Sequence, residues 1–243
     1  MLSKNEGDRI KICCVGDSLT YGNVGYSYIH FFNENIDAKN KGVNGETLRG
    51  AYKRLENILE NPNSDYDIYI VEIGANDVLL PYLKTVSPFW FLMMGVRCKV
   101  KKCIEDDDVF YDEYIKLLEL FSERSENVIV LGLPILNFKN FPQQKVVKRN
   151  EIISEIARKH DYPFIDIYNL QAENIEAESY EYSWKFGFLM RCLDAIIMTL
   201  FPFTKDWFSK LRGLNMTVDG AHLNSTSAKL VASSIEKVIY KEL

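Results

Sequence analysis

The sequence predicts an α/β fold, a three-layer α/β/α sandwich with a central parallel sheet of about five strands. Two observations support this prediction. Short, β-branched apolar runs of strand length recur along the chain, and longer segments with helical periodicity lie between them. Strands that alternate with helices form βαβ units, whose right-handed crossovers cover both faces of a parallel sheet with helices.

The predicted strands are short runs dominated by apolar and β-branched residues, as expected where both faces of a parallel sheet are covered. Four runs meet this description, namely residues 12–15, 68–73, 128–133 and 164–167. A fifth, weaker strand is predicted near residues 37–40. Together these strands form the predicted sheet.

Segments with apolar residues every three or four positions lie between the predicted strands. The clearest is 109–121, with apolar side chains at positions 110, 114, 117, 118 and 121. Residues 47–59 and 146–159 show the same periodicity, and a last helix is predicted to begin near Ser225.

The chain has 243 residues, of which 47% are hydrophobic and 26% charged, as in one globular domain over residues 1–243. The net charge is −5 and no basic stripe is present, so we expect no nucleic-acid partner. A lysine-rich run at 99–102 is followed by an acidic run at 105–108. We interpret this pair of runs as a solvated helix start rather than as a membrane or nucleic-acid patch.

Two unusually apolar stretches do not fit the alternation of strands and helices, and we interpret them as insertions near residues 78–104 and 183–212. Neither contains 18 uninterrupted apolar residues, so no membrane-spanning segment is expected. These stretches could form a lid over a ligand crevice, an extension of the core or an interface of a homo-oligomer, and the sequence does not decide between these three roles.

The five cysteines have neither the paired spacing of a zinc site nor that of a disulfide framework. The first ten residues are polar and lack the apolar segment of a secretory signal, so reduced thiols in the cytoplasm are expected. With three histidines in the chain, no histidine-rich metal site is expected, and we interpret His30 and His160 as structural or solvent-facing.

The first predicted strand runs directly into Gly16-Asp17-Ser18. Ligands of open parallel sheets bind beyond the carboxyl ends of the strands, so the hydroxyl of Ser18 is expected to face this crevice. Taken alone, the same tripeptide also fits a turn that caps the next helix.

Asp219 lies three residues before His222, just ahead of the last predicted helix. A serine hydroxyl becomes a strong nucleophile when an imidazole accepts its proton, and a carboxylate on the other ring nitrogen orients the imidazole. Asp219 and His222 have the residue types for these two roles, although the motif alone also fits a surface turn.

Two further motifs follow predicted strands, Asn44-Gly45 and Gly74-Ala75-Asn76-Asp77. Acyl transfer places negative charge on an oxygen atom, which backbone N–H groups and side-chain amides stabilise. The candidate oxyanion donors are therefore the N–H groups of Ser18 and Gly45 and the amide of Asn76. Individually, Gly45 also fits a helix-entry turn and Asn76 an Asx turn.

In this order, the Gly-Asp-Ser-Leu, glycine, Gly-x-Asn-Asp and Asp-x-x-His blocks resemble those of the SGNH hydrolases, or GDSL-type esterases and lipases. The resemblance extends from Lys11 to the last helix and leaves out the two apolar stretches. It implies the flavodoxin-like SGNH hydrolase fold, with family-defining roles for Ser18, Gly45, Asn76 and His222. It also implies that Asp219 is the third member of the triad and that no cofactor is required.

The resulting hypothesis is a serine ester hydrolase, an esterase or lipase-like acylhydrolase that acts on a small-molecule, lipidic or glycan ester. A carbohydrate O-acetyl esterase is the alternative, and a non-catalytic interaction protein on the same scaffold is the third possibility. Val78, Leu79 and Leu80 directly follow the Asn76 motif and are the candidate substrate-binding residues.

Overall fold

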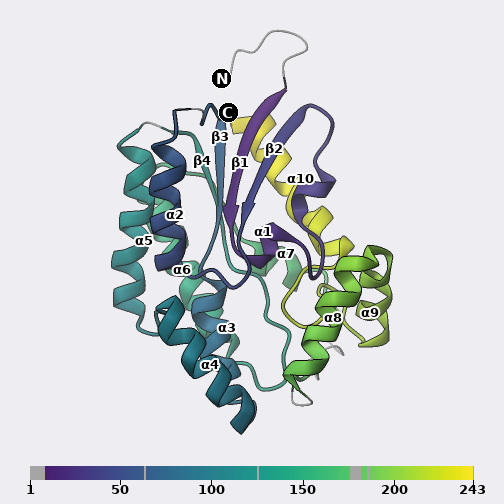
Figure 1. The fold of residues 1–243 in the computed structure, drawn as a ribbon. Helices are drawn as coiled ribbons and strands as arrows, with labels where there is room; N and C mark the ends of the chain where they lie inside the picture. The colour runs from purple at the N-terminus through teal and green to yellow at the C-terminus, as the bar shows by residue number, and fades with distance from the viewer. Residues whose placement is uncertain (1–8, 63, 125, 176–181, 185–186, 243) are drawn as a thin grey trace.

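The computed structural model describes residues 9–62, 64–124, 126–175, 182–184 and 187–242 (Figure 1). A five-stranded parallel sheet lies at its centre, in the order β2-β1-β3-β4-β5. The strands are β1 (Ile10–Gly16), β2 (Ile36–Gly42), β3 (Ile68–Glu72), β4 (Val128–Leu131) and β5 (Phe164–Ile165). The predicted fold class is therefore confirmed, including the weaker strand, β2.

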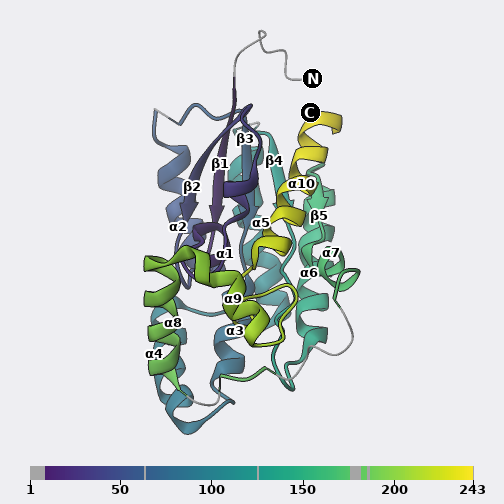
Figure 2. The same ribbon diagram turned by 90° about the vertical axis from the view of Figure 1, so that its right-hand side faces the viewer.

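Helices cover both faces of the sheet, whose strands β1, β3 and β4 are almost fully buried (Figures 1 and 2). Three contacting helices lie on one face, α2 (Leu48–Leu59), α5 (Asp107–Ser122) and α6 (Gln143–Lys159). On the other face, α10 (Ser225–Glu242) contacts the 3₁₀-helix η1 (Tyr28–Phe31) and α7 (Ile167–Ala172). Fully buried side chains such as Ile12 and Ile70 form the core between these layers.

The register of the sheet places three strand ends beside one another. Gly16 at the end of β1 pairs with Gly42 of β2 and with Glu72 of β3. The short helix α1 (Ser18–Tyr21), the Asn44-Gly45 turn and helix α3 (Ala75–Leu83) begin just beyond this edge. The motifs that follow the first three strands therefore lie together.

The strands predicted over 12–15 and near 37–40 are longer in the structure, whereas the other three end one or two residues earlier than predicted because their apolar runs continue past the ladder. The strand predicted over 128–133 ends at Leu131, and the one predicted over 164–167 ends at Ile165. A carboxylate oxygen of Asp166 accepts a hydrogen bond from the backbone N–H of Asn169 and so begins α7, a helix that was not predicted.

The two apolar stretches interpreted as insertions fold into helices. The first contains most of α3 and all of α4 (Pro88–Lys101). The second contains α8 (Phe188–Leu200), the 3₁₀-helix η2 (Pro202–Thr204) and α9 (Lys205–Leu211). Figure 2 shows α4 and α8 on the same side of the molecule. Within the described part of the chain, no helix combines the length and apolar character needed to cross a membrane.

The prediction of a solvated helix start is confirmed for the acidic run but not for the lysine-rich run, which ends the preceding helix. Lys99 and Lys101 lie in the last turn of α4, where positive charge interacts favourably with the helix dipole. The acidic run begins the next helix instead, since Asp106 accepts a hydrogen bond from the backbone N–H of Val109 at the start of α5. The two runs therefore belong to different helices.

Candidate active site

Ser18 is held at the end of β1 by a tight strand-to-helix turn. A Cβ atom on Gly16 would lie 2.1 Å from Oγ1 of Thr20 and 2.7 Å from the carbonyl oxygen of Glu72, so only glycine fits there. Asp17 then caps α1, because its Oδ1 accepts a hydrogen bond of 2.9 Å from the N–H of Leu19. Ser18 is thus the first residue of α1.

Two carboxyl groups are buried at this strand end, Asp17 next to Ser18 in the chain and Glu72 at the end of β3. Burial raises the pKa of Asp17 to about 6, and burial together with the charge of Asp17 raises the pKa of Glu72 well above its ordinary value. Burial and the neighbouring charge therefore both oppose ionisation of Glu72, which disfavours two negative charges beside the strand end.

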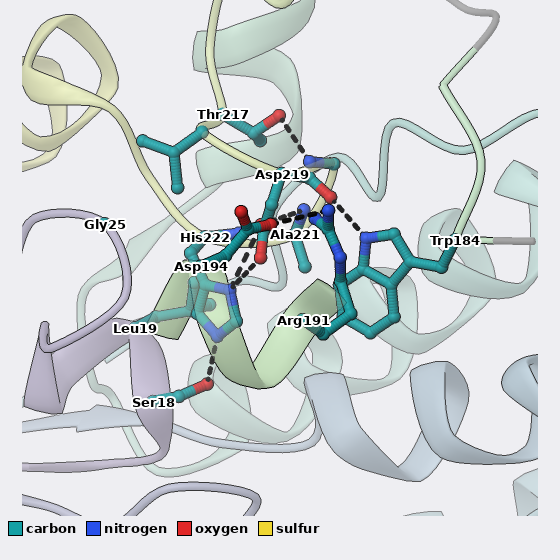
Figure 3. Close-up of polar contacts among 12 residues, drawn as sticks. Ser18, Leu19, Gly25, Trp184, Arg191, Asp194, Thr217, Asp219, Ala221 and His222 are labelled. Carbon is teal, nitrogen blue, oxygen red and sulfur yellow. Dashed lines mark hydrogen bonds and ion pairs between the residues drawn. The ribbon is translucent and has the colours of Figure 1, made fainter. Parts of the chain in front are cut away.

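Ser18, His222 and Asp219 form one hydrogen-bonded line (Figure 3). Nε2 of His222 lies 3.1 Å from Oγ of Ser18, and Nδ1 lies 2.9 Å from Oδ2 of Asp219. Asp219 also accepts hydrogen bonds from the backbone N–H groups of Ala221 and His222, which fixes the loop that carries the imidazole. This arrangement can transfer a proton from the serine hydroxyl to the imidazole.

The pKa shifts of His222 and Asp219 favour that proton transfer. Burial alone lowers the pKa of His222, but the charge and hydrogen bond of Asp219 outweigh it, and the net pKa is raised. Burial opposes ionisation of Asp219, yet the imidazolium charge and hydrogen bonds lower the pKa of this carboxyl to about 2. Asp219 is therefore ionised at neutral pH and stabilises a protonated His222.

The candidate oxyanion donors lie at the same cavity as this line. Ser18, Gly45, Asn76 and His222 all contribute to its wall. Gly45 has a φ of 67°, a conformation that favours glycine. Nδ2 of Asn76 donates a hydrogen bond of 2.7 Å to Oδ2 of Asp17, which fixes the amide and leaves its second N–H for another acceptor.

The cavity has a volume of about 280 Å³, and most of its wall is apolar. Leu79 and Leu80 line it, whereas Val78 does not. Successive helical residues point about 100° apart, so Val78 faces a different hollow, which it shares with Pro81 and Arg149. The position of Val78 outside this cavity does not support its prediction as a substrate-binding residue.

Helices α4 and α8 supply the wall opposite α3. Trp90 and Met94 project from α4, and Phe188, Cys192 and Ala195 project from α8. The rings of Trp90 and Phe188 meet edge to face at 5.7 Å between centroids, so the two helices close the cavity together. The sequence signal for this wall was the helical spacing of Trp90, Met94 and Arg97, which was not used in the prediction.

Three residues of the second apolar stretch hold the loops that carry Ser18 and His222 and were missed by the sequence analysis. Nε1 of Trp184 donates to the carbonyl oxygen of Asp219 at 2.7 Å (Figure 3). Arg212 donates to the carbonyl oxygen of Val218 at 2.8 Å, and Nζ of Lys205 donates to the carbonyl oxygen of Gly22 at 3.0 Å. No short sequence motif predicts these contacts. In each of them a side chain donates to a backbone carbonyl of a loop, an acceptor that every residue type provides.

Two arginines add positive charge to the cavity. Arg191 forms an ion pair with Asp194, which also pairs with Arg212, so this cluster carries a net positive charge (Figure 3). Arg97 has no hydrogen bond or ion pair with any residue that the structure describes, and it lies against Gly45. His30 and His160 do not line the cavity. No group of three or more His, Cys, Asp or Glu residues in the described chain could hold a metal ion.

Comparison with known structures shows the same fold in proteins of low sequence identity. A member of the lipolytic protein G-D-S-L family from Veillonella parvula has a TM-score of 0.62 and 18% identity, over 96% of this chain and 99% of that chain. An acetylxylan esterase from Geobacillus stearothermophilus has a TM-score of 0.60 and 17% identity, over 97% and 96%. A lipase/acylhydrolase from Enterococcus faecalis gives 0.56 and 18%, over 94% and 95%.

Comparison by sequence identifies a family but no individual relative among the curated proteins. No curated protein matches the chain. The family model of the GDSL-like lipase/acylhydrolase family matches residues 14–186, which is more than half of the chain and includes Ser18, Gly45 and Asn76. This match confirms the resemblance predicted from the four motifs, and the chain therefore belongs to this family of ester-hydrolysing enzymes.

Proposed function

We propose that the chain is a serine ester hydrolase in which Ser18 is the nucleophile, His222 the general base and Asp219 the group that orients the imidazole. The observation that carries the proposal is the continuous line of hydrogen bonds from Ser18 through His222 to Asp219. His222 accepts the proton of Ser18 as Oγ attacks the ester carbonyl, and then returns it to the leaving alcohol. Water hydrolyses the acyl-enzyme in the second step.

The oxyanion of both steps would be stabilised by the N–H groups of Ser18 and Gly45 and by the amide of Asn76. All three residues line the cavity that holds the nucleophile. The bond from Asn76 to Asp17 supports this role, because a donor that is already oriented needs no reorganisation when the charge develops.

An ester with an apolar acyl chain fits the cavity best. Its wall on α3, α4 and α8 is built from leucine, methionine and aromatic side chains, and the residues that bring charge are arginines. A carbohydrate O-acetyl ester remains the second candidate, since acetylxylan esterases share the fold. We also propose a cytoplasmic location, supported by five free thiols.

Hydrolysis of p-nitrophenyl esters from acetate to long acyl chains tests the proposed substrate class. We expect kcat/KM to rise from acetate to a medium chain length, because each additional buried methylene stabilises the bound chain by about 0.8 kcal/mol. Ala195→Phe should move the optimum toward acetate, since Ala195 lines the cavity. Ile196→Phe is the matched control, because Ile196 is 54% exposed and does not line the cavity.

The outcomes of this series separate the candidates. A preference for acetate alone would favour the deacetylase. An absence of turnover with every ester, under conditions where the protein is folded, would favour the non-catalytic protein.

A further inference from the structure

The outer faces of α4 and α8 expose large apolar side chains. Phe91, Leu92 and Val96 of α4 and Leu189, Leu193 and Ile196 of α8 are each at least half exposed. Both helices lie on the same side of the molecule in Figure 2. Their ends are joined by a contact between the rings of Phe89 and Phe188, with centroids 6.1 Å apart. We call this set of exposed side chains the apolar face.

The same two helices are also apolar on their inner sides, where they form the wall of the cavity. A helix that is apolar all round is normally buried or lies within a membrane. With 14 and 13 residues, α4 and α8 are shorter than the roughly 20 residues needed to span a bilayer. Helices of this kind can lie in the plane of a lipid surface with an apolar side inserted.

Lysine side chains lie at the border of the apolar face. Residues 88–102 and 187–213 together contain eight Lys or Arg residues and two Asp residues, but Lys205 is buried and Arg97 and Arg191 line the cavity. One of the two Asp residues, Asp194, is buried and paired with Arg191 and Arg212. Lys99 and Lys102 are exposed at the end of α4. Lys210 of α9 is exposed as well, whereas an exposed acidic run follows at 105–108, so the basic border is confined to these lysines.

We propose that the apolar face binds an anionic lipid surface, with α4 and α8 lying in its plane. Insertion would bury the apolar side chains, and the lysines would contact acidic headgroups. A symmetric dimer through the same face would bring identical basic segments together, which like-charge repulsion disfavours. The cavity that contains Ser18 lies directly behind the two helices, so a lipidic ester would have a short path to the nucleophile.

Vesicle binding by the full chain tests this proposal without any measurement of turnover. In a flotation assay, we expect binding to vesicles of phosphatidylcholine with phosphatidylglycerol, and weaker binding to phosphatidylcholine alone. Leu193→Glu/Ile196→Glu should weaken binding at least tenfold. Lys99→Gln/Lys102→Gln should weaken it roughly 20–30-fold on the acidic vesicles alone, since each basic residue at such a surface contributes about fivefold.

The control is a pair of apolar-to-acidic changes on other helices. Val109 and Val147 lie on α5 and α6 and are 39% and 38% exposed, so Val109→Glu/Val147→Glu should bind as the wild type does. Circular dichroism and thermal unfolding establish that each variant is folded. Binding that is equal for the α8 variant and the control would overturn the proposal. The proposal would also be overturned if the wild-type chain bound neither vesicle type and formed a dimer, with the α8 variant monomeric.

A second observation, on Arg97, points to the chemistry of the substrate. A Cβ atom on Gly45 would lie 2.0 Å from Nη2 of Arg97, so the guanidinium rests on the glycine of the proposed oxyanion site. Along α4, the side chains that line the cavity change from Trp90 and Met94 to Arg97. The apolar part of this wall suits an acyl chain, which leaves the cationic part for the alcohol side of the ester.

We infer that Arg97 binds an anionic group, a phosphate or a carboxylate, on the alcohol part of the substrate. An arginine without a partner in the described chain has all its donors free for such a group, and guanidinium binds planar or tetrahedral anions through paired hydrogen bonds. This inference rests on the proposed ester hydrolase activity and specifies its substrate.

Two matched esters test the role of Arg97, 1-butyrylglycerol and 1-butyrylglycerol 3-phosphate. We expect wild-type kcat/KM to be higher for the phosphate ester. Arg97→Gln should lower the ratio of the two kcat/KM values by about 10–100-fold, mainly through KM, and Arg97→Lys should restore part of it. Arg158→Gln, on the exposed surface of α6, is the control and should leave the ratio unchanged.

The failures of the two ideas are distinguishable. If the enzyme hydrolyses both esters with equal kcat/KM, or if Arg97→Gln does not change the ratio, the anion site is wrong. If neither ester is hydrolysed in a manner that depends on Ser18, the ester hydrolase itself is wrong.

Discussion

Ser18→Ala is expected to lower kcat toward any accepted ester by about 10⁴–10⁶-fold, because removal of the nucleophile leaves only substrate binding and the oxyanion donors. Among the residues that the structure describes, the hydroxyl makes one hydrogen bond, to Nε2 of His222, so its loss should leave the fold unchanged. The measurement is kcat on the best p-nitrophenyl ester, with thermal unfolding of each variant as the test of folding.

A double-mutant cycle sharpens this test. If Ser18 and His222 act as one unit, His222→Ala should cost about as much as Ser18→Ala, and the double variant should cost no more than either. Losses that add in free energy would contradict the proposed proton transfer. Residual activity near the wild-type level in Ser18→Ala would contradict the assignment of the nucleophile.

Asp219→Asn is expected to lower kcat by roughly 10²–10⁴-fold and to move the acid limb of the pH profile. Asn retains an acceptor for the N–H groups of Ala221 and His222, so the loop should keep its shape. The negative charge that raises the pKa of His222 disappears, however, and the imidazole then loses its proton at a lower pH.

The sign of that change follows from the role of the base. His222 must be neutral to accept a proton, so kcat/KM falls as the pH drops through its pKa. In the wild type this fall should occur above pH 6.5, the ordinary value for histidine, and in Asp219→Asn at a lower pH. Profiles of kcat/KM from pH 5 to 9 measure the difference. Asp106→Asn, at the cap of α5, removes a remote carboxylate and should not move the limb.

The sheet and the strand-end motifs could be predicted because local patterns determine them. The apolar runs of β1, β3 and β4 are short and rich in β-branched residues, which favours strands over helices. Parallel pairing brings the ends of these strands to one edge of the sheet. That edge places Ser18 near Gly45 and Asn76. The spacing of Asp219 and His222 is also local, since one carboxylate accepts both the ring N–H and the backbone N–H.

The walls of the site could not be predicted in the same way. Val78, Leu79 and Leu80 are equally apolar, and only the packing of α3 decides which of them face the cavity. Arg97 is close to Gly45 because α4 folds back over the strand ends, a contact across 52 positions of sequence that no spacing rule encodes. Such contacts depend on tertiary packing rather than on periodicity.

The hydrogen bonds that tie residues 184–212 to the catalytic loops determine how this wall can move. Trp184 holds Asp219 through its carbonyl oxygen, and Trp90 in turn donates to the carbonyl oxygen of Trp184 at 3.0 Å. If this wall swung outward to admit a bulky ester, it would pull on the residue that aligns the imidazole. We therefore expect esters too wide for the resting cavity to be poor substrates, because their entry would disturb the alignment of His222 before any bond is broken.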